Sequence, residues 1–369
     1  MDSKTDNEIL YKGNKILLEK GDKMKINLDE ASSRISNNVT ILRFFAAILV
    51  IFCHSFHIGM NQEDPFSVIT GGRLNFGGFA VAIFFFLSGF YITKSLEKTT
   101  SLKDFFIKRG KRIFPQLWIV ILLTIVVVGL FFSKAGIKEY LLNKTTCVYL
   151  LNMILIPIHN LPFSFQENIY GATVNGALWT LPVEMFAYIA LGFMSFFCNK
   201  ILKKRISAVG LHILSTMILM LGLLYADFAL ESTFFSAIFR ALLLFFVGCL
   251  YADYRKRIVL DWRIACVLIL VMLIGVFTIF VNYVVVFTLP YIICCLIIGT
   301  RQLKRVPIVF NASYEMYLLG WPIQQMVTSL FGGSMNTYLN FLITVPIDVA
   351  IALLIYYLVE GRKKKSMTK

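Results

Sequence analysis

Charged residues are scarce in this sequence, and their scarcity excludes an ordinary water-soluble protein. Only 15% of the 369 residues are Asp, Glu, Lys or Arg, whereas 58% are hydrophobic. Soluble domains usually carry about 25% charged residues. The mean hydropathy of +0.74 also indicates a chain that is not water-soluble. Several apolar runs approach the roughly 20 residues that span a bilayer core, so we predict an integral membrane protein.

Other features are missing as well. There is no glycine-rich phosphate-binding motif of the Walker or Rossmann type, so a nucleotide-binding fold is not expected. The seven cysteines show no metal-ligand spacing, so we expect no metal site and interpret them as small buried residues. The first apolar run begins only at Ile41, behind a charged tail, and no small-residue cleavage pattern follows it. A cleavable signal peptide is therefore not expected.

The apolar runs predict an all-α fold, a polytopic transmembrane bundle of about ten spans. Residues 1–38 are expected to form a polar, flexible cytoplasmic tail, residues 39–360 the membrane domain and residues 361–369 a basic cytoplasmic tail. The predicted spans are 41–59, 77–95, 115–132, 176–197, 207–227, 234–251, 263–280, 282–299, 308–331 and 338–358.

The positive charge predicts the orientation of the chain rather than a nucleic-acid partner. The net charge is +15, and Lys and Arg cluster between the apolar runs. With ten spans, these clusters fall on one side, the cytoplasm, together with both termini. The apolar segment 146–158 is short for a span, and counting it would place the later clusters outside. We therefore interpret 133–175 as one outer connection, and expect a multi-pass protein of the cytoplasmic membrane, surrounded by lipid.

Ionisable residues inside spans are costly and often functional. Arg43 and His54 share the first span, 11 residues apart, which is about 16 Å along a helix. Glu184 has a depth in the span 176–197 that matches His54, and a carboxylate can orient an imidazole. Alternatives remain open, since Arg43 could snorkel to lipid phosphates and His54 could be a satisfied hydrogen-bonding residue.

Two further pairs of charges have structural as well as functional interpretations. Arg240 and Asp348 lie in the spans 234–251 and 338–358, and they could form a buried ion pair. Arg109 and Arg112 lie in a cytoplasmic connection at i and i+3, so they share a face of a helix. Two guanidinium groups on one face suit phosphate binding, but a basic helix on anionic lipid has the same pattern.

Five motifs follow one another along the chain. They are Arg43-(ten residues)-His54, Phe84-Phe-Phe-Leu-Ser88-Gly89-Phe90, Arg109-x-x-Arg112-Ile-x-Pro115, Leu178-Trp179-Thr180-Leu181-x-x-Glu184 and Ser313-Tyr314-x-x-Tyr317-Leu-x-x-x-Pro322. In this order they resemble the acyltransferase 3 family of integral membrane acyltransferases, over roughly residues 38–360. The family's late segment often has a histidine where this chain has Gly320, so a second catalytic histidine is not expected.

The resemblance implies transfer of an acyl group, often acetyl, from acyl-CoA to a hydroxyl of a cell-surface glycan or glycolipid. Acyl-CoA would be a donor substrate, with no permanently bound cofactor. His54 would act as general base or acyl carrier with Arg43 and Glu184, and Arg109 and Arg112 would hold the phosphates of the donor. Weaker candidates for the substrate cavity are Ser88, Trp179, Tyr317, Arg240 and Asp348.

A transporter or flippase for a glycan or small solute is the alternative, because buried Arg, His and Glu residues also form substrate and proton pathways. Inverted repeats would favour transport, and none is evident in the sequence.

Overall fold

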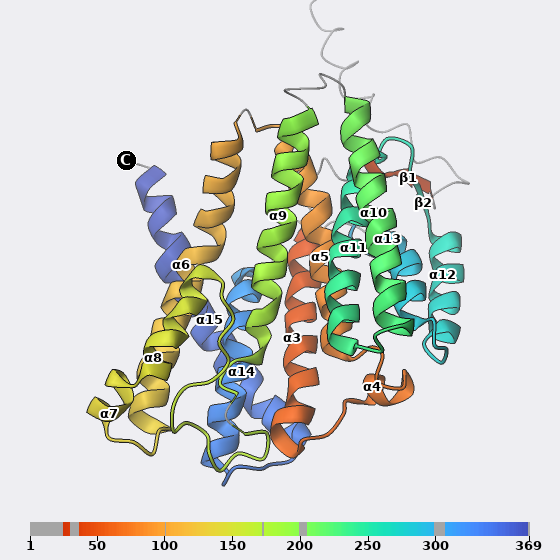
Figure 1. Ribbon diagram of the computed structural model, residues 1–369. Helices are drawn as coiled ribbons and strands as arrows, with labels where there is room; N and C mark the ends of the chain where they lie inside the picture. The colour runs from red at the N-terminus through yellow and green to blue at the C-terminus, as the bar shows by residue number, and fades with distance from the viewer. Residues whose placement is uncertain are drawn as a thin grey trace, which may run out of the picture.

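The computed structural model describes residues 25–29, 37–99, 101–171, 173–198, 205–298 and 307–367. Within these residues the chain is almost entirely helical, and ten helices of 14 or more residues form one bundle (Figure 1). Each overlaps one predicted span, which confirms the all-α polytopic fold. They are α3 (Asn37–Met60), α5 (Phe76–Leu96), α6 (Leu102–Phe131), α9 (Thr180–Phe197), α10 (Arg205–Phe228), α11 (Thr233–Asp253), α12 (Trp262–Gly275), α13 (Val281–Ile298), α14 (Ser313–Leu330) and α15 (Thr337–Met367).

Seven segments of the described chain, in α3, α5, α6, α9, α10, α11 and α15, are long and apolar enough to cross a bilayer. The three remaining bundle helices differ in length or polarity. Helices α12 and α13 are apolar but shorter, and α14 buries the amide side chains of Gln324 and Gln325. A buried amide needs hydrogen-bond partners, and both glutamines donate to backbone carbonyls of other segments.

The described residues of the predicted outer connection contain no helix long enough to span a bilayer. Three short helices fill it, α7 (Ile137–Leu142), α8 (Lys144–Tyr149) and η1 (Leu150–Ile154), all too short to cross a bilayer. They lie beside α6 (Figure 1), and Trp118 of α6 donates a hydrogen bond to the carbonyl of Met153 at 3.0 Å. Three other short helices are α4 (Pro65–Ile69), η2 (Gly176–Trp179) and η4 (Ile308–Ala312).

Both ends of the described chain lie at the same end of the bundle, here called the terminal face (Figure 1). The opposite end, the distal face, carries the connection 133–175. Strand β1 (Lys25–Asn27) pairs antiparallel with β2 (Val259–Asp261), so part of the predicted tail is held against the terminal face. Residues 1–24 and 30–36 of that tail lie outside the described residues. Helix α15 continues to Met367, into the predicted basic tail.

Helices α5 and α11 pack backbone to backbone at the centre of the bundle. A Cβ atom at Gly89 would lie 1.9 Å from the carbonyl oxygen of Phe245, and one at Gly248 would lie 2.3 Å from the carbonyl oxygen of Phe86. Small residues permit such contact between membrane helices. Gly89 therefore serves packing, and it fixes the position of its neighbour Ser88 on α5.

Candidate active site

Three neighbouring cavities lie beside α3 inside the bundle. The first, the entrance pocket, opens near the terminal face between the start of α3 and the end of α15, with Thr40 and Glu360 in its wall. It shares Arg43, Arg112, Ser313 and Tyr314 with the second cavity, the arginine chamber. The third, the histidine chamber, contains His54 and shares Val81 and Tyr317 with the arginine chamber. The three cavities therefore adjoin one another along α3.

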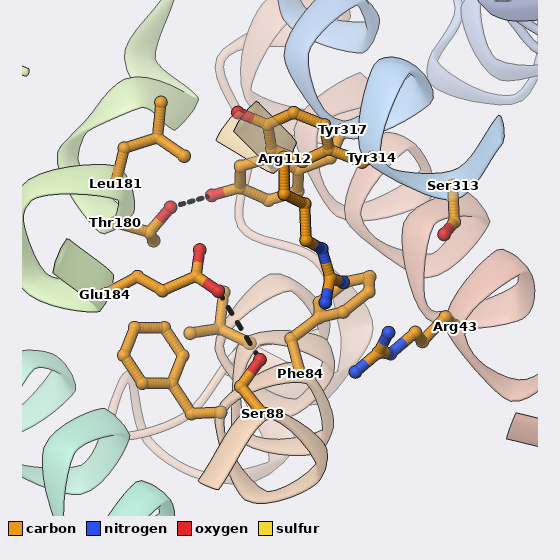
Figure 2. A pocket seen from close by; sticks show the side chains of 12 residues that line it. Arg43, Phe84, Ser88, Arg112, Thr180, Leu181, Glu184, Ser313, Tyr314 and Tyr317 are labelled. Atoms are coloured by element: carbon orange, nitrogen blue, oxygen red, sulfur yellow. Dashed lines mark hydrogen bonds between the residues drawn. The ribbon is translucent and has the colours of Figure 1, made fainter. Parts of the chain in front are cut away.

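Two arginines define the middle cavity. Arg43 of α3 and Arg112 of α6 extend their guanidinium groups into it from different helices (Figure 2). Neither forms a salt bridge with a carboxylate among the described residues. Unpaired guanidinium groups that converge on one cavity form a binding site for an anion, and their planar donors suit phosphate.

Glu184 lies on the opposite wall of the arginine chamber, and other side chains position its carboxylate. Ser88 donates to Glu184 Oε1 at 3.4 Å (Figure 2), and Tyr188 donates a short hydrogen bond to the same oxygen. Tyr188 is buried on the same helix, one turn further along. The chamber therefore has cationic groups on one side and a fixed carboxylate on the other.

The histidine chamber is larger and lined by aromatic rings. Its volume is about 380 Å³, against about 70 Å³ for the arginine chamber. The ring of His54 meets the edge of Trp321 at a centroid distance of 4.6 Å. Tyr170 and Trp179 also line the chamber. Burial, with a smaller contribution from the charge of Glu63, raises the pKa of Tyr170, so its hydroxyl stays protonated at neutral pH.

Tyr317 of α14 separates the two chambers, and hydrogen bonds hold its side chain. Its hydroxyl bonds to Thr180 Oγ1 at 2.6 Å (Figure 2) and donates to the carbonyl of Ala177 at 2.9 Å. Both partners belong to the η2–α9 segment, which contains the Leu178-Trp179-Thr180 motif. The motif therefore builds the wall at the boundary between the chambers.

His54 and Glu184 do not meet. Glu184 faces the arginine chamber, whereas His54 lines the other one. His54 Nδ1 is buried, and it has no hydrogen-bond partner among the described residues. The expected pair of the Glu184 carboxylate with the His54 imidazole is therefore not formed among the described residues. The charged groups that share the chamber with Glu184 are Arg43 and Arg112.

The basic motif contributes only one of its two arginines to the cavities. The segment is helical, because α6 already begins at Leu102. Arg112 lines both the entrance pocket and the arginine chamber. Arg109 lines neither, and its guanidinium lies over the ring of Phe105 at 5.9 Å from the centroid. The pair that converges is Arg43 with Arg112, from two helices, rather than Arg109 with Arg112.

The expected ion pair between Arg240 and Asp348 is wrong. Arg240 donates a short hydrogen bond to Asn282 Oδ1, and Asn282 Nδ2 donates to both carboxylate oxygens of Asp227 at 3.1 and 3.0 Å. Helix α11 packs against α5, α10 and α13, whereas α15 packs against α3 and α14, so the two charges lie on different sides of the bundle. Both Asp348 oxygens are buried without a partner among the described residues.

Several residues of the histidine chamber were not found from the sequence. Trp321 and Tyr170 are aromatic residues in an aromatic-rich chain, and nothing in their spacing marks them. Cys53, His57 and Asp64 place one potential ligand atom each within 4.8 Å of one another. Cys53 and His57 are at i and i+4 of one helix, which is a usable signal, but Asp64 reaches them only through a turn.

Comparison with known proteins agrees with the motifs. An acyltransferase domain model of the acyltransferase 3 family matches residues 36–360. The chain is 26% identical over 346 residues to the "O-acetyl transferase" of Shigella phage Sf6, covering 89% of this chain and 96% of that protein. It is 37% identical over 171 residues to "Nodulation protein 10" of Rhizobium leguminosarum bv. viciae, covering 44% of this chain and 45% of that protein.

No solved structure matches the chain. The family model covers nearly the whole helical bundle, including all three cavities. The chain therefore belongs to the acyltransferase 3 family, and it is a multi-pass membrane acyltransferase.

Proposed function

We propose that this protein transfers an acetyl group from acetyl-CoA to a hydroxyl of a cell-surface glycan or glycolipid, across the cytoplasmic membrane. One observation carries the proposal. Two arginines that form no salt bridge with a carboxylate of the described residues line a cavity that adjoins the entrance pocket on one side and the chamber of His54, across Tyr317, on the other. The donor would enter from the terminal face and the acceptor from the distal face.

Arg43 and Arg112 would hold phosphate groups of the donor. Arg112 is exposed at the entrance, whereas Arg43 is half-buried, so an anion could meet Arg112 first and Arg43 next. The arginine chamber has a volume of about 70 Å³, which suits the slender pantetheine arm better than a sugar ring. The arm would follow α3 towards His54, about 16 Å further along the helix.

The histidine chamber has the character of a sugar site. Trp179, Tyr170 and Trp321 offer apolar faces for a sugar ring, while Arg73 and Glu63 offer polar groups for its hydroxyls. Binding sites commonly combine aromatic walls with a few placed polar groups. The printed name of the phage Sf6 relative, an O-acetyl transferase matched over 96% of its length, supports an oxygen acceptor and an acetyl donor.

In the simplest mechanism, His54 takes the proton from the acceptor hydroxyl as its oxygen attacks the thioester carbonyl. The carbon–sulfur bond then breaks, and the leaving thiolate takes the proton from the imidazolium. His54 could instead carry the acetyl group as an acyl-imidazole before transfer. Glu184 would act within the arginine chamber and would not orient the imidazole, because its carboxylate accepts hydrogen bonds from Ser88 and Tyr188.

The test compares ester-linked acetyl in surface glycans from cells with the wild-type gene, the His54→Ala variant, the His159→Ala variant and no gene. His159 is the matched control, because its ring bonds to the carbonyl of Asn175 and lines none of the three cavities. We expect acetyl to be lost with His54→Ala and without the gene, and kept with His159→Ala, at equal protein levels.

Intact acetylation by the His54→Ala variant would overturn the mechanism. If acetylation is unchanged in all strains but export of a glycan or solute is lost, the transporter interpretation replaces the proposal.

A further inference from the structure

Three side chains of types that can bind metals, two of them buried and one partly buried, lie together at one side of the histidine chamber. Cys53 and His57 lie one helical turn apart on α3, and Asp64 returns against them from the turn that follows the helix. Cys53 and Asp64 are 1% and 0% exposed. The Cys53 Sγ atom lies 3.4 Å from Asp64 Oδ2. Nothing in the proposed acyl transfer uses these three side chains together.

Local backbone structure presents Asp64 to the helix. Asn61 ends α3 in the left-handed region, with a φ of 50°, a conformation that Asn tolerates better than most residues. Asp64 then caps α4, and its Oδ1 accepts hydrogen bonds from the amides of Phe66 and Ser67 at 2.9 and 3.2 Å. One carboxylate oxygen is thereby fixed by the cap, and Oδ2 is left facing Cys53.

We propose that Cys53, His57 and Asp64 bind a divalent ion of the zinc class. Thiolate, imidazole and carboxylate are the ligands that zinc accepts, and the sulfur and nitrogen ligands disfavour calcium and magnesium. In a tetrahedral site, bonds of about 2.3 Å to sulfur and about 2.1 Å to oxygen separate the two ligand atoms by about 3.6 Å. The observed separation of 3.4 Å is close to that edge.

The charge of the site is also balanced. A thiolate and a carboxylate together neutralise a divalent ion, which is what burial requires. Cys53 Sγ lies beside the first turn of α5, where a Cβ at Gly77 would be 3.2 Å from it. The ring of His57 is partly buried next to that of Tyr170, at a centroid distance of 6.1 Å, and one of its nitrogens lies within 4.8 Å of the other two ligand atoms.

The ion would brace the rim of the histidine chamber. Cys53, His57 and Glu63 all line that chamber, and a zinc ion with three protein ligands keeps a fourth position for water or another oxygen. The ion would link the turn 61–64, through Asp64, to Cys53 and His57 of α3, which lie on either side of His54 in the sequence. This role does not depend on the proposed acyl transfer, because it concerns binding and the stability of the turn.

The test uses Co²⁺ as the probe, on the full chain purified in detergent with any affinity tag removed. Cobalt enters zinc sites, and a near-ultraviolet charge-transfer band reports a thiolate ligand. We expect one Co²⁺ per chain, displaced by Zn²⁺ but not by Ca²⁺. The band should vanish in Cys53→Ser and persist in Cys147→Ser, because Cys147 is exposed and outside the cluster.

Two further variants separate metal binding from folding. Asp64→Asn keeps an oxygen for the helix cap but replaces the second ligand oxygen with an amide nitrogen, and His57→Gln removes the imidazole. Each should lower the affinity for Co²⁺ at least about tenfold. Loss of a residue that only hydrogen-bonds to a metal ligand already lowers metal affinity by about this factor. Their melting temperatures without metal should match the wild type, and Zn²⁺ should raise only the wild-type value.

Binding below one ion per chain, a spectrum without the thiolate band, or a band that survives Cys53→Ser would overturn the proposal. The Cys53–Asp64 contact would then be a plain thiol–carboxylate hydrogen bond. The readouts are metal content and absorption. They are therefore independent of the loss of acetyl transfer that tests the proposed function.

Discussion

Arg43 and Arg112 extend into one chamber from helices that are far apart in the sequence, and neither is paired with a carboxylate among the described residues (Figure 2). This relationship links two motifs that look independent in the sequence. In the Arg43–His54 motif, Arg43 would bind the donor and His54 would take part in acyl transfer. Helix α3 would thus carry a residue for each of the two tasks.

The first prediction separates Arg112 from Arg109. Arg112→Lys replaces a planar fork of donors with a single ammonium, so a charge-assisted hydrogen bond to phosphate is lost, worth about 1.5–3 kcal/mol. We expect the KM for acetyl-CoA to rise roughly 10- to 150-fold, with kcat less affected. Arg109→Lys is the matched control, and its KM should change several-fold less.

Initial rates in membrane vesicles against acetyl-CoA concentration would measure both variants. An equal rise in KM for Arg109→Lys and Arg112→Lys would mean that the two act as one phosphate site, contrary to the geometry.

The second prediction concerns the boundary at Tyr317. Tyr317→Phe loses the bonds to Thr180 and Ala177, each worth about 1 kcal/mol, but keeps the ring, so transfer should fall only modestly. Tyr317→Ala removes the wall between the chambers and admits water to the thioester. We expect Tyr317→Ala to hydrolyse acetyl-CoA without an acceptor, measured as free thiol released. Thiol release equal to that of the wild type would show that another side chain keeps water out.

The third prediction tests the partners of Arg240. A double-mutant cycle on Arg240 and Asn282 should give a coupling energy of about 1–3 kcal/mol, because the two groups are in direct contact. A cycle on Arg240 and Asp348 should give about 0.5 kcal/mol or less, the usual result for distant sites. Unfolding in mixed detergent would measure each stability. Strong coupling to Asp348 would restore the ion pair that the structure contradicts.

The fourth prediction concerns the contact between α5 and α11. Gly89→Ala would place a methyl group 1.9 Å from the carbonyl oxygen of Phe245, so the backbones must separate. We expect a loss of stability of about 1–3 kcal/mol or more, as for overpacked cores. Gly210→Ala is the control, because its Cβ would meet nothing within 4 Å. Melting temperatures in detergent should fall for Gly89→Ala alone.

The bundle could be predicted because its signal is local. Each of the ten helices corresponds to one apolar run, and the need to satisfy backbone hydrogen bonds in lipid makes such a run helical. The short strand β1 could not be predicted. Three residues of a polar tail carry no pattern, and the pairing depends on β2, more than 230 positions later in the chain.

The site was only partly predictable for a related reason. Arg43, His54 and Glu184 were found as ionisable residues inside predicted spans, and Ser88 and Tyr317 were found through the family resemblance. The structure distributes the five over two adjoining chambers. The side chains that these residues contact were harder to predict. Depth along a helix suggested that Glu184 meets His54, but depth does not fix the direction in which a side chain points. Charge alone suggested Asp348 for Arg240, whereas the actual partner is the neutral Asn282.

The pairing of β1 with β2 has a consequence for biosynthesis. Leu28 donates to the carbonyl of Ile258, and Arg255 bonds to both Asp29 and Glu97. Residues 25–29 therefore cannot form the strand pair, or the bond from Arg255 to Asp29, until the ribosome has made the chain beyond residue 261. By then the helices α3 to α11 have already been synthesised, so the first described segment to be made is among the last to complete its contacts.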